Sequence, residues 1–382
     1  MIPLFYPSLD KDTILQNIEK VLNEKIIADG AWVEGFEQKI GEYLSDIYSG
    51  TRYRVVALNS GTAALHIAYT LAGIKEGDEV IVPVLTCTAT THPILWLKAK
   101  PVFADIQLDT LNIDPEDIKK KITAKTKAIV VMHNGGLPCD MDEVMAIADE
   151  YHLKVIEDAA QGFGGEYKGR KLGTIGDYGC FSLQAIKLLT TGDGGFIVCK
   201  DEKDESIARQ LKWFGIDRIQ QKKRGSLVPS RFAKLFEQRA MTFDIDITGY
   251  KYNMNNIMAA IGLANLEKIN DWLEQKKEYV KIYRTELADV KNIKLLKEVE
   301  GNSNWLFQVI IPDGRERFQK EMGKAGIETN MVQVRNDIYT VFGGRREELP
   351  NMNLLEDKYC SLPIHNGLTK EDVLKICQTI KS

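Results

Sequence analysis

KAIVVMHNGGLPCDMDEVMAIADEYHLKVIEDAA, residues 127–160, is the stretch that decides the fold. An apolar run ends at His133, a helical pattern starts near Asp140, and a second apolar run ends at Asp158. Two short apolar runs separated by a helix are typical of parallel strands joined by a crossover connection. The stretch therefore predicts one strand–helix–strand unit.

The same alternation extends in both directions, from about residue 55 to residue 200. The apolar runs RVVAL, EVIVP and PVFADI precede the first stretch, and YGCFSL and GGFIVC follow it. Helical patterns begin near Thr62, Pro93 and Asp114. Strands that alternate with helices predict a mostly parallel sheet with helices on both faces, an α/β fold of three α/β/α layers.

The remainder of the chain is organised differently. A polar, basic-rich region from about Asp217 to Arg239 reads as a long excursion or lid, and Asn256 to Val280 is strongly helical in pattern. Short strands and helices are mixed beyond residue 292. We predict a large domain over 1–248, whose first 30 or so residues form an N-terminal arm, and a smaller α+β domain over 249–382.

Composition excludes several classes of protein. The 382 residues carry 50 Lys and Arg against 54 Asp and Glu, so no basic field favours nucleic acid. The apolar stretch 79–97 is interrupted by Pro83 and Pro93 and does not suit a membrane span. Six scattered cysteines without a C-x-x-C pair favour reduced thiols and no metal site. With no secretory signal at the start, we expect a cytoplasmic protein without nucleic-acid or membrane partners.

Functional residues of such a sheet collect beyond the carboxyl ends of its strands, where loops lead into helices. Five segments occupy these positions: Asn59–Thr62, Thr86–Thr88, His133–Gly136, Asp158–Gln161 and Ser182–Lys187.

The segment Ser60-Gly61-Thr62 opens a helix after the RVVAL strand. Backbone N–H groups at a helix start, together with the Thr62 hydroxyl, form a cradle suited to a phosphate. The alternative is a helix cap with no further role.

Asp158 and Lys187 are the two titratable candidates. A carboxylate at a strand end can be desolvated and then needs a cationic partner such as a protonated pyridine nitrogen, although a capping role is the alternative. Lys187 lies in an apolar context before the glycine-rich turn TTGDGG. Desolvation can lower the pKa of such an amine and make it a nucleophile for an aldehyde, although a surface lysine is the alternative.

At this point the sequence resembles the DegT-type (DegT/DnrJ/EryC/StrS) sugar aminotransferases. These are fold-type-I enzymes that use pyridoxal 5′-phosphate, and the resemblance covers nearly the whole chain. The matching segments are IPLFYPSL, NSGTAAL, EVIVPVLTCTAT, EDAAQGFGGEYKG, Ser182 to Lys187 with TTGDGG, GYKYNMNNIMAAIG and SLPIH.

The resemblance implies a role for each matching residue. Lys187 would condense with the cofactor aldehyde, Asp158 would pair with the pyridinium nitrogen, and Gln161 would bond the phenolic oxygen. The phosphate would be held by the residues at the helix start and on a neighbouring strand, which are Ser60, Gly61, Thr62 and Ser182.

Two further positions concern the partner subunit and the cofactor ring. Asn253, or alternatively Lys251, would reach the phosphate from a neighbouring subunit, which implies a homodimer with shared active sites. Cys87 stands where many relatives have a ring-stacking aromatic residue, so Cys87 itself, Thr88 or His133 would cover that face.

The implied reaction moves an amino group from L-glutamate to a keto group of a nucleotide-linked deoxysugar, for polysaccharide biosynthesis. The mechanism would be ping-pong, with pyridoxamine 5′-phosphate as the intermediate form. Candidate substrate-binding residues are Arg218, Arg335 and His133, and Lys222, Lys223 and Arg224 are additional cations in the excursion.

Three alternatives stay open. The acceptor could be a non-nucleotide cyclic ketone such as an inosose. A sugar dehydratase on the same scaffold typically has histidine in place of the lysine, so Lys187 argues against it. A regulatory homologue without turnover is a different class, but no helix-turn-helix appendage or basic stripe is present.

Overall fold

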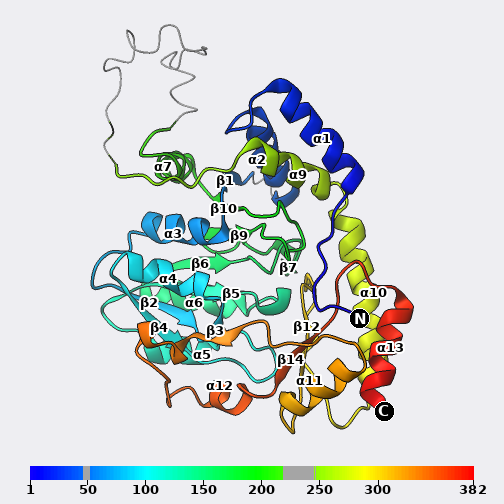
Figure 1. Ribbon diagram of the computed structural model, residues 1–382. Helices are drawn as coiled ribbons and strands as arrows, with labels where there is room; N and C mark the ends of the chain where they lie inside the picture. The colour runs from blue at the N-terminus through cyan, green and yellow to red at the C-terminus, as the bar shows by residue number, and fades with distance from the viewer. Residues whose placement is uncertain (46–51, 218–244, 246) are drawn as a thin grey trace.

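The central sheet has seven strands within residues 1–45, 52–217, 245 and 247–382, which the computed structural model describes (Figure 1). The strand order is β1-β10-β9-β6-β5-β2-β4. All neighbouring pairs are parallel except those that involve β10, which runs antiparallel to β1 and β9. The strands are β1 (Arg54–Leu58), β2 (Glu79–Pro83), β4 (Lys100–Ala104), β5 (Thr126–Met132), β6 (Lys154–Asp158), β9 (Tyr178–Ser182) and β10 (Gly195–Cys199).

Helices cover both faces of this sheet, because alternate side chains of each buried strand point to opposite faces. Val80 and Val82 pack with α3 (Gly61–Leu71), α4 (Thr88–Trp96) and α7 (Glu202–Lys212). Ile81, between them, packs with α5 (Pro115–Lys121) and α6 (Met141–Tyr151). The predicted three-layer α/β/α fold is confirmed.

The helix starts follow from local capping chemistry. Ser60, Asp114 and Asp201 each accept a hydrogen bond from a backbone N–H in the first turn of α3, α5 and α7. Pro115 occupies the first turn of α5, where its missing N–H costs nothing.

The helical pattern over 256–280 forms two helices and not one. The first, α9 (Asn256–Leu266), packs against α1 (Lys11–Glu24) and α2 (Ala31–Leu44). The second, α10 (Ile269–Leu287), packs against α13 (Lys370–Lys381). The Asn265 side chain donates to Thr190 O and accepts from Asp10 N. These two bonds hold the end of α9 against the loop after β9 and against the residue before α1.

A second, antiparallel sheet lies in the C-terminal part, with β12 (Phe307–Ile310) between β11 (Lys294–Leu295) and β14 (Tyr359–Leu362). Around it lie α10, α13 and α11 (Arg315–Lys324), and α12 (Pro350–Leu355) packs on the large core. The predicted boundary at residue 248 stays a prediction. The remaining short elements are β3 (Leu85–Thr86), β7 (Glu166–Tyr167), β8 (Arg170–Lys171), β13 (Val334–Arg335), η1 (Asn134–Gly136), η2 (Asn336–Ile338) and η3 (Thr340–Phe342).

The N-terminal segment reaches the C-terminal part of the molecule (Figure 1). Ile2 forms a parallel bridge with Ile327, through hydrogen bonds from Ile2 N to Gly326 O and from Glu328 N to Ile2 O. The predicted excursion after Asp217 falls on residues 218–244, outside the described residues. Of the helices that are described, none combines the length and the apolar character of a membrane span.

The contact between β10 and the start of α3 yields a stability prediction. A Cβ on Gly195 would lie 2.5 Å from the Gly61 nitrogen, a backbone atom that cannot rotate away. Gly195→Ala should lower the free energy of unfolding by about 1–3 kcal/mol in denaturant titrations. Gly35→Ala in α2 is the matched control, because no atom lies within 4 Å of its added Cβ. The control should raise stability slightly, and an equal effect of both changes would contradict the argument.

Candidate active site

The predicted segments lie at one edge of the sheet. The carboxyl ends of the parallel strands β2, β5, β6 and β9 meet there, together with the end of β1 and the start of β10. The close approach of Gly195 to Ser60 joins the start of β10 to the start of α3. Candidate residues that are far apart in sequence are therefore brought to the same region.

The start of α3 forms an anion cradle. The Ser60 hydroxyl accepts from Ala63 N at 3.1 Å, and the first N–H groups of the helix have no partner within the helix itself. A Cβ on Gly61 would lie 2.8 Å from Ser182 Cβ, so only glycine lets the strand end approach this closely. Ser182 is half-buried, and its Cβ lies beside the helix start. This arrangement suits a phosphate.

Asp158 ends β6 and is only 3% exposed. Its Oδ2 accepts from Thr90 Oγ1 at 2.6 Å, and its Oδ1 accepts from Ala160 N at 3.1 Å. Thr90 Oγ1 is in turn 2.7 Å from Thr86 Oγ1. Burial raises the pKa of Asp158, while the bond from Thr90 and the charge of Lys187 act in the opposite direction. A cation bound beside this carboxylate would keep it ionised.

Lys187 follows β9 and is partly buried. Burial lowers the pKa of its amine to about 8, against the opposing charges of Asp158 and Cys87. The Nζ atom lies 4.0 Å from the centroid of the Trp305 ring. Near neutral pH this amine therefore has a larger uncharged, nucleophilic fraction than an ordinary lysine.

Gln161 is held in place from both sides. Its Oε1 accepts from Gly135 N at 2.7 Å, and its backbone carbonyl accepts from Ser303 Oγ at 2.9 Å. Because the carbonyl oxygen of the side chain is used, the amide NH2 group is the end that can donate to a ligand.

Cys87 precedes α4 as its N-cap residue and is exposed. Cys87 acts on the Lys187 amine, whose pKa it raises. Asn253 is placed beside the end of β1 by a bridge with Leu58, and its Oδ1 accepts from Lys251 Nζ. The cofactor roles of Cys87 and Asn253 stay predictions.

His133 does not fit the predicted contact with a substrate. The side chain is completely buried, and Nδ1 accepts from Cys139 N at 3.2 Å. The ring is therefore the Nε2–H tautomer, which donates to Glu157 Oε2 at 3.0 Å. Glu157 also accepts from three backbone N–H groups, those of Gly173, Ile175 and Gly176. Both ring nitrogens of His133 are thus used inside the protein.

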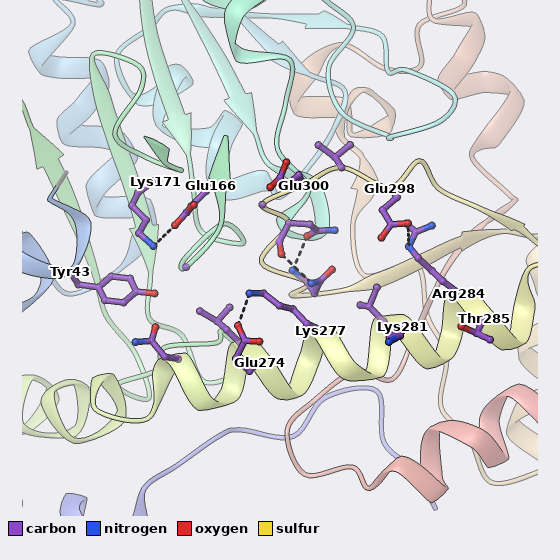
Figure 2. A pocket seen from close by; sticks show the side chains of 18 residues that line it. Tyr43, Glu166, Lys171, Glu274, Lys277, Lys281, Arg284, Thr285, Glu298 and Glu300 are labelled. Atoms are coloured by element: carbon purple, nitrogen blue, oxygen red, sulfur yellow. Dashed lines mark hydrogen bonds and ion pairs between the residues drawn. The ribbon is translucent and has the colours of Figure 1, made fainter. Parts of the chain in front are cut away.

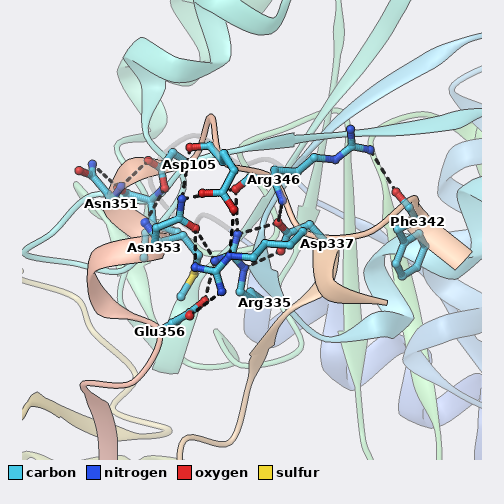
Figure 3. Close-up of polar contacts among 12 residues, drawn as sticks. Asp105, Arg335, Asp337, Phe342, Arg346, Asn351, Asn353 and Glu356 are labelled. Atoms are coloured by element: carbon cyan, nitrogen blue, oxygen red, sulfur yellow. Dashed lines mark hydrogen bonds and ion pairs between the residues drawn. The ribbon is translucent and has the colours of Figure 1, made fainter. Parts of the chain in front are cut away.

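The Arg335 side chain is likewise buried, and Figure 3 shows its bonds to other residues of the chain. It forms a bidentate pair with Asp337, at 2.7 and 2.6 Å, and a bond to Glu356 at 2.6 Å. Asp337 is completely buried and Arg335 is 3% exposed, so the guanidinium has its charge compensated before any ligand arrives. The predicted diphosphate contact by Arg335 is not supported. Arg218 lies outside the described residues.

A cavity of about 850 Å³ lies elsewhere, between α10, the β7–β8 hairpin and the loop before β12 (Figure 2). Three ion pairs lie along its described lining: Lys171 with Glu166, Lys277 with Glu274, and Arg284 with Glu298. The predicted cofactor residues are not among the described residues that line it. Within the described part of the chain, no group of three or more His, Cys, Asp or Glu could hold a metal ion.

Sequence reasoning missed Thr90, Ser303 and Trp305. Thr90 falls within the TCTATT run after the second strand, so a hydroxyl facing a strand-end acid could have been sought there. Ser303 and Trp305 come from the C-terminal part, more than 100 residues from Lys187, and no local pattern marks them.

The comparisons with known proteins agree with this geometry. The family described as "DegT/DnrJ/EryC1/StrS aminotransferase family" matches residues 8–381. GDP-perosamine synthase of Escherichia coli O157:H7 is 33% identical, over 99% of this chain and 97% of its own length.

Two solved proteins have the same fold over the whole chain. The sugar aminotransferase CalS13 from Micromonospora echinospora has a TM-score of 0.89 at 31% identity, with 100% of this chain and 99% of that chain covered. The putative sugar aminotransferase Spr1654 from Streptococcus pneumoniae, in its PMP-form, has a TM-score of 0.89 at 27% identity, with 100% and 98% covered. Its PLP-form gives 0.87 at 26% identity, with 100% and 97% covered.

The Glu157 carboxylate provides a test of how the loop 173–176 is held. Burial alone would raise the pKa of Glu157, but hydrogen bonds from His133 and the backbone lower it below the ordinary value of 4.5. A carboxyl with a lowered folded-state pKa contributes stability above about pH 4.5 and loses it as the pH falls through the folded-state pKa. Glu157→Gln should therefore cost about 1–3 kcal/mol at pH 7, and less in acid.

Urea unfolding of both proteins at several pH values measures this difference. A stability gap that stays constant from pH 7 into the acid range would contradict the assignment of the ionised carboxylate.

Proposed function

The chain belongs to the DegT/DnrJ/EryC1/StrS aminotransferase family, and we propose that it transfers an amino group from glutamate to a keto group of a nucleotide-linked sugar. It is a sugar transaminase that depends on pyridoxal 5′-phosphate, as the enzymes of this family do. The donor, the nucleotide and the ping-pong order of the two half-reactions are the parts that we propose.

The residues at the sheet edge fit this cofactor. The proposed phosphate site is the start of α3, which consists of Ser60, Gly61 and Thr62 with Ser182 beside it. A Cβ on Gly61 would collide with Ser182, so glycine is needed for this close approach. Asp158 is buried, and its negative charge is costly there unless a cation such as a pyridinium nitrogen pairs with it. Gln161 has a free amide donor for a phenolic oxygen, and Lys187 would attach to the aldehyde.

When bound, pyridoxal 5′-phosphate supplies an electron sink for the carbon from which a proton is removed. The chain itself supplies proton transfer and orientation. Lys187 Nζ has a pKa of about 8 and can act as the general base that takes a proton from the amino-bearing carbon. It can then act as the general acid that gives this proton back in a later step. Asp158 is oriented by Thr90 and Ala160, so its carboxylate does not have to reorganise during the reaction.

A nucleotide-linked acceptor is supported by the similarity to GDP-perosamine synthase. The cations proposed for the diphosphate are Arg218, Lys222, Lys223 and Arg224, all of which lie outside the described residues. A non-nucleotide cyclic ketone is the alternative acceptor. The presence of Lys187 continues to argue against a dehydratase.

We further propose a cytoplasmic homodimer with shared active sites, serving polysaccharide biosynthesis. An apolar surface on α1 and the turn after it supports a subunit contact. Leu15, Leu22 and Ile26 are each 56% exposed there, and Ile27 is 54% exposed. Apolar side chains grouped in this way are typical of an interface.

Lys187→Ala should abolish amino transfer and the covalent link to the cofactor, because it removes the amine whose charge acts on Asp158. Mass spectrometry after borohydride reduction should find the pyridoxyl adduct on Lys187 in the parent protein. Lys276→Met is the matched control, because Lys276 is the other buried lysine near the same small cavity. An adduct on Lys276, or on no lysine, would overturn the assignment.

A substrate panel tests the acceptor. GDP-linked and other nucleotide-linked ketosugars, and cyclic ketones without a nucleotide, would each be incubated with glutamate while 2-oxoglutarate release is followed. We expect release with a nucleotide-linked ketosugar, with the parallel double-reciprocal plots of ping-pong kinetics, and none with Lys187→Ala. Turnover of cyclic ketones alone would favour the alternative acceptor.

A further inference from the structure

The loop over residues 302–306 comes from the C-terminal part of the chain and ends in the candidate active site. Trp305 lies on it, with its ring centroid 4.0 Å from Lys187 Nζ. Neither the catalytic scheme nor the sequence motifs give this residue a role. A lysine amine over an aromatic face at this distance forms a cation–π contact when it is protonated.

The Trp305 ring is fixed by contacts that do not involve the amine. Its indole N–H donates to the carbonyl oxygen of Ile186 at 2.8 Å, directly before Lys187. Phe5 stacks on it, with centroids 5.5 Å apart and planes inclined by 28°. Trp305 is only 4% exposed. The aromatic face is therefore held in position and does not follow the lysine as it moves.

The backbone of the same loop is bonded to the other side of the site. Ser303 donates from its hydroxyl to Gln161 O and from its N–H to Gly136 O, and Leu306 N donates to Gly135 O. The ring is thus fixed relative to Gln161 as well as to the start of Lys187. The fixed ring therefore determines the position that Lys187 Nζ can occupy when it contacts the aromatic face.

The charged and titratable groups near Lys187 are few. Asp158 and Cys87 act on its amine from the sheet edge and from the start of α4. On the other side, a cavity of about 20 Å³ is lined by Lys187, Trp305, Lys276 and His365, with Tyr6 at its margin. No Asp or Glu is among the described residues that line this cavity, so the aromatic face is the electron-rich surface that the amine meets there.

We propose that Trp305 is a positioning residue that holds the protonated amine of Lys187 whenever the lysine is not attached to the cofactor. This inference rests on the proposed function, because a ping-pong transaminase needs its lysine detached through half of each cycle. The aromatic face favours the charged form, so the amine stays near Asp158 and does not rotate into solvent. Without the Trp305 ring, the free amine should be held less firmly and should be protonated less readily.

The test measures the pKa of Lys187 in the full-length protein loaded with pyridoxamine 5′-phosphate, which leaves the amine unattached. Trace acetylation with acetic anhydride across a pH series, resolved by peptide mass spectrometry, gives this pKa directly. In Trp305→Leu we expect the pKa of Lys187 to fall by about one pH unit. Trp305→Phe keeps an aromatic face and should show less than half of that fall.

Two controls separate the aromatic face from packing. Phe5→Leu removes the stacking partner of Trp305 but keeps the aromatic ring and its indole N–H bond to Ile186 O, so the pKa of Lys187 should fall much less than in Trp305→Leu. Replacement of the tryptophans by fluorinated tryptophans keeps their volume while it weakens the aromatic face. The pKa of Lys187 should then fall in steps with the number of fluorine atoms, even if Trp305→Leu does not fold.

A pKa that is the same in the parent, in Trp305→Leu and in the fluorinated proteins would overturn the inference. Equal falls in Trp305→Leu and Trp305→Phe would also overturn it, because loss of the indole N–H bond would then explain the change. The borohydride adduct distinguishes this failure from failure of the proposed function. An adduct on Lys187 with an unchanged pKa rejects only the role of Trp305, whereas an adduct elsewhere rejects the catalytic assignment itself.

Discussion

A carboxylate that is removed from water must be hydrogen bonded or paired with a cation, and this requirement shapes the site around Asp158. One oxygen is bound by the hydroxyl of Thr90 and the other by the N–H of Ala160. Two bonds do not replace the hydration of a full negative charge, and burial accordingly raises the pKa of the acid. In the function that we propose, a cationic ring nitrogen would supply the missing partner, so cofactor binding and ionisation of Asp158 would be coupled.

Much of the fold follows from patterns that are local in the sequence. Strand–helix alternation gives the layered sheet, and parallel strands bring their carboxyl ends to one edge, so Ser60, Asp158 and Lys187 could be named before their geometry was known. Each of them is marked by its position relative to a strand end or a helix start. The family resemblance then gave these positions a common cofactor.

The sequence did not reveal contacts that are made across long separations. The sequence did not show that His133 and Arg335 are bonded inside the protein, because their partners Glu157 and Glu356 are 24 and 21 positions away. Trp305 reaches Lys187 from the loop before β12, across a separation that no periodic pattern encodes. The break between α9 and α10 was missed for the same reason, since the side chain of Asn265 bonds to Asp10 and Thr190.

The bridge between Ile2 and Ile327 has a consequence for biosynthesis. During synthesis, the segment around Ile2 cannot dock until residues 326–328 have left the ribosome, because its hydrogen-bond partners do not yet exist. Phe5 lies in the same N-terminal segment, and it can stack on Trp305 only after residue 305 has left the ribosome. The strands of the large sheet, which lie between residues 54 and 199, can therefore pair before residue 305 is synthesised, and the aromatic contacts around Lys187 can form only afterwards.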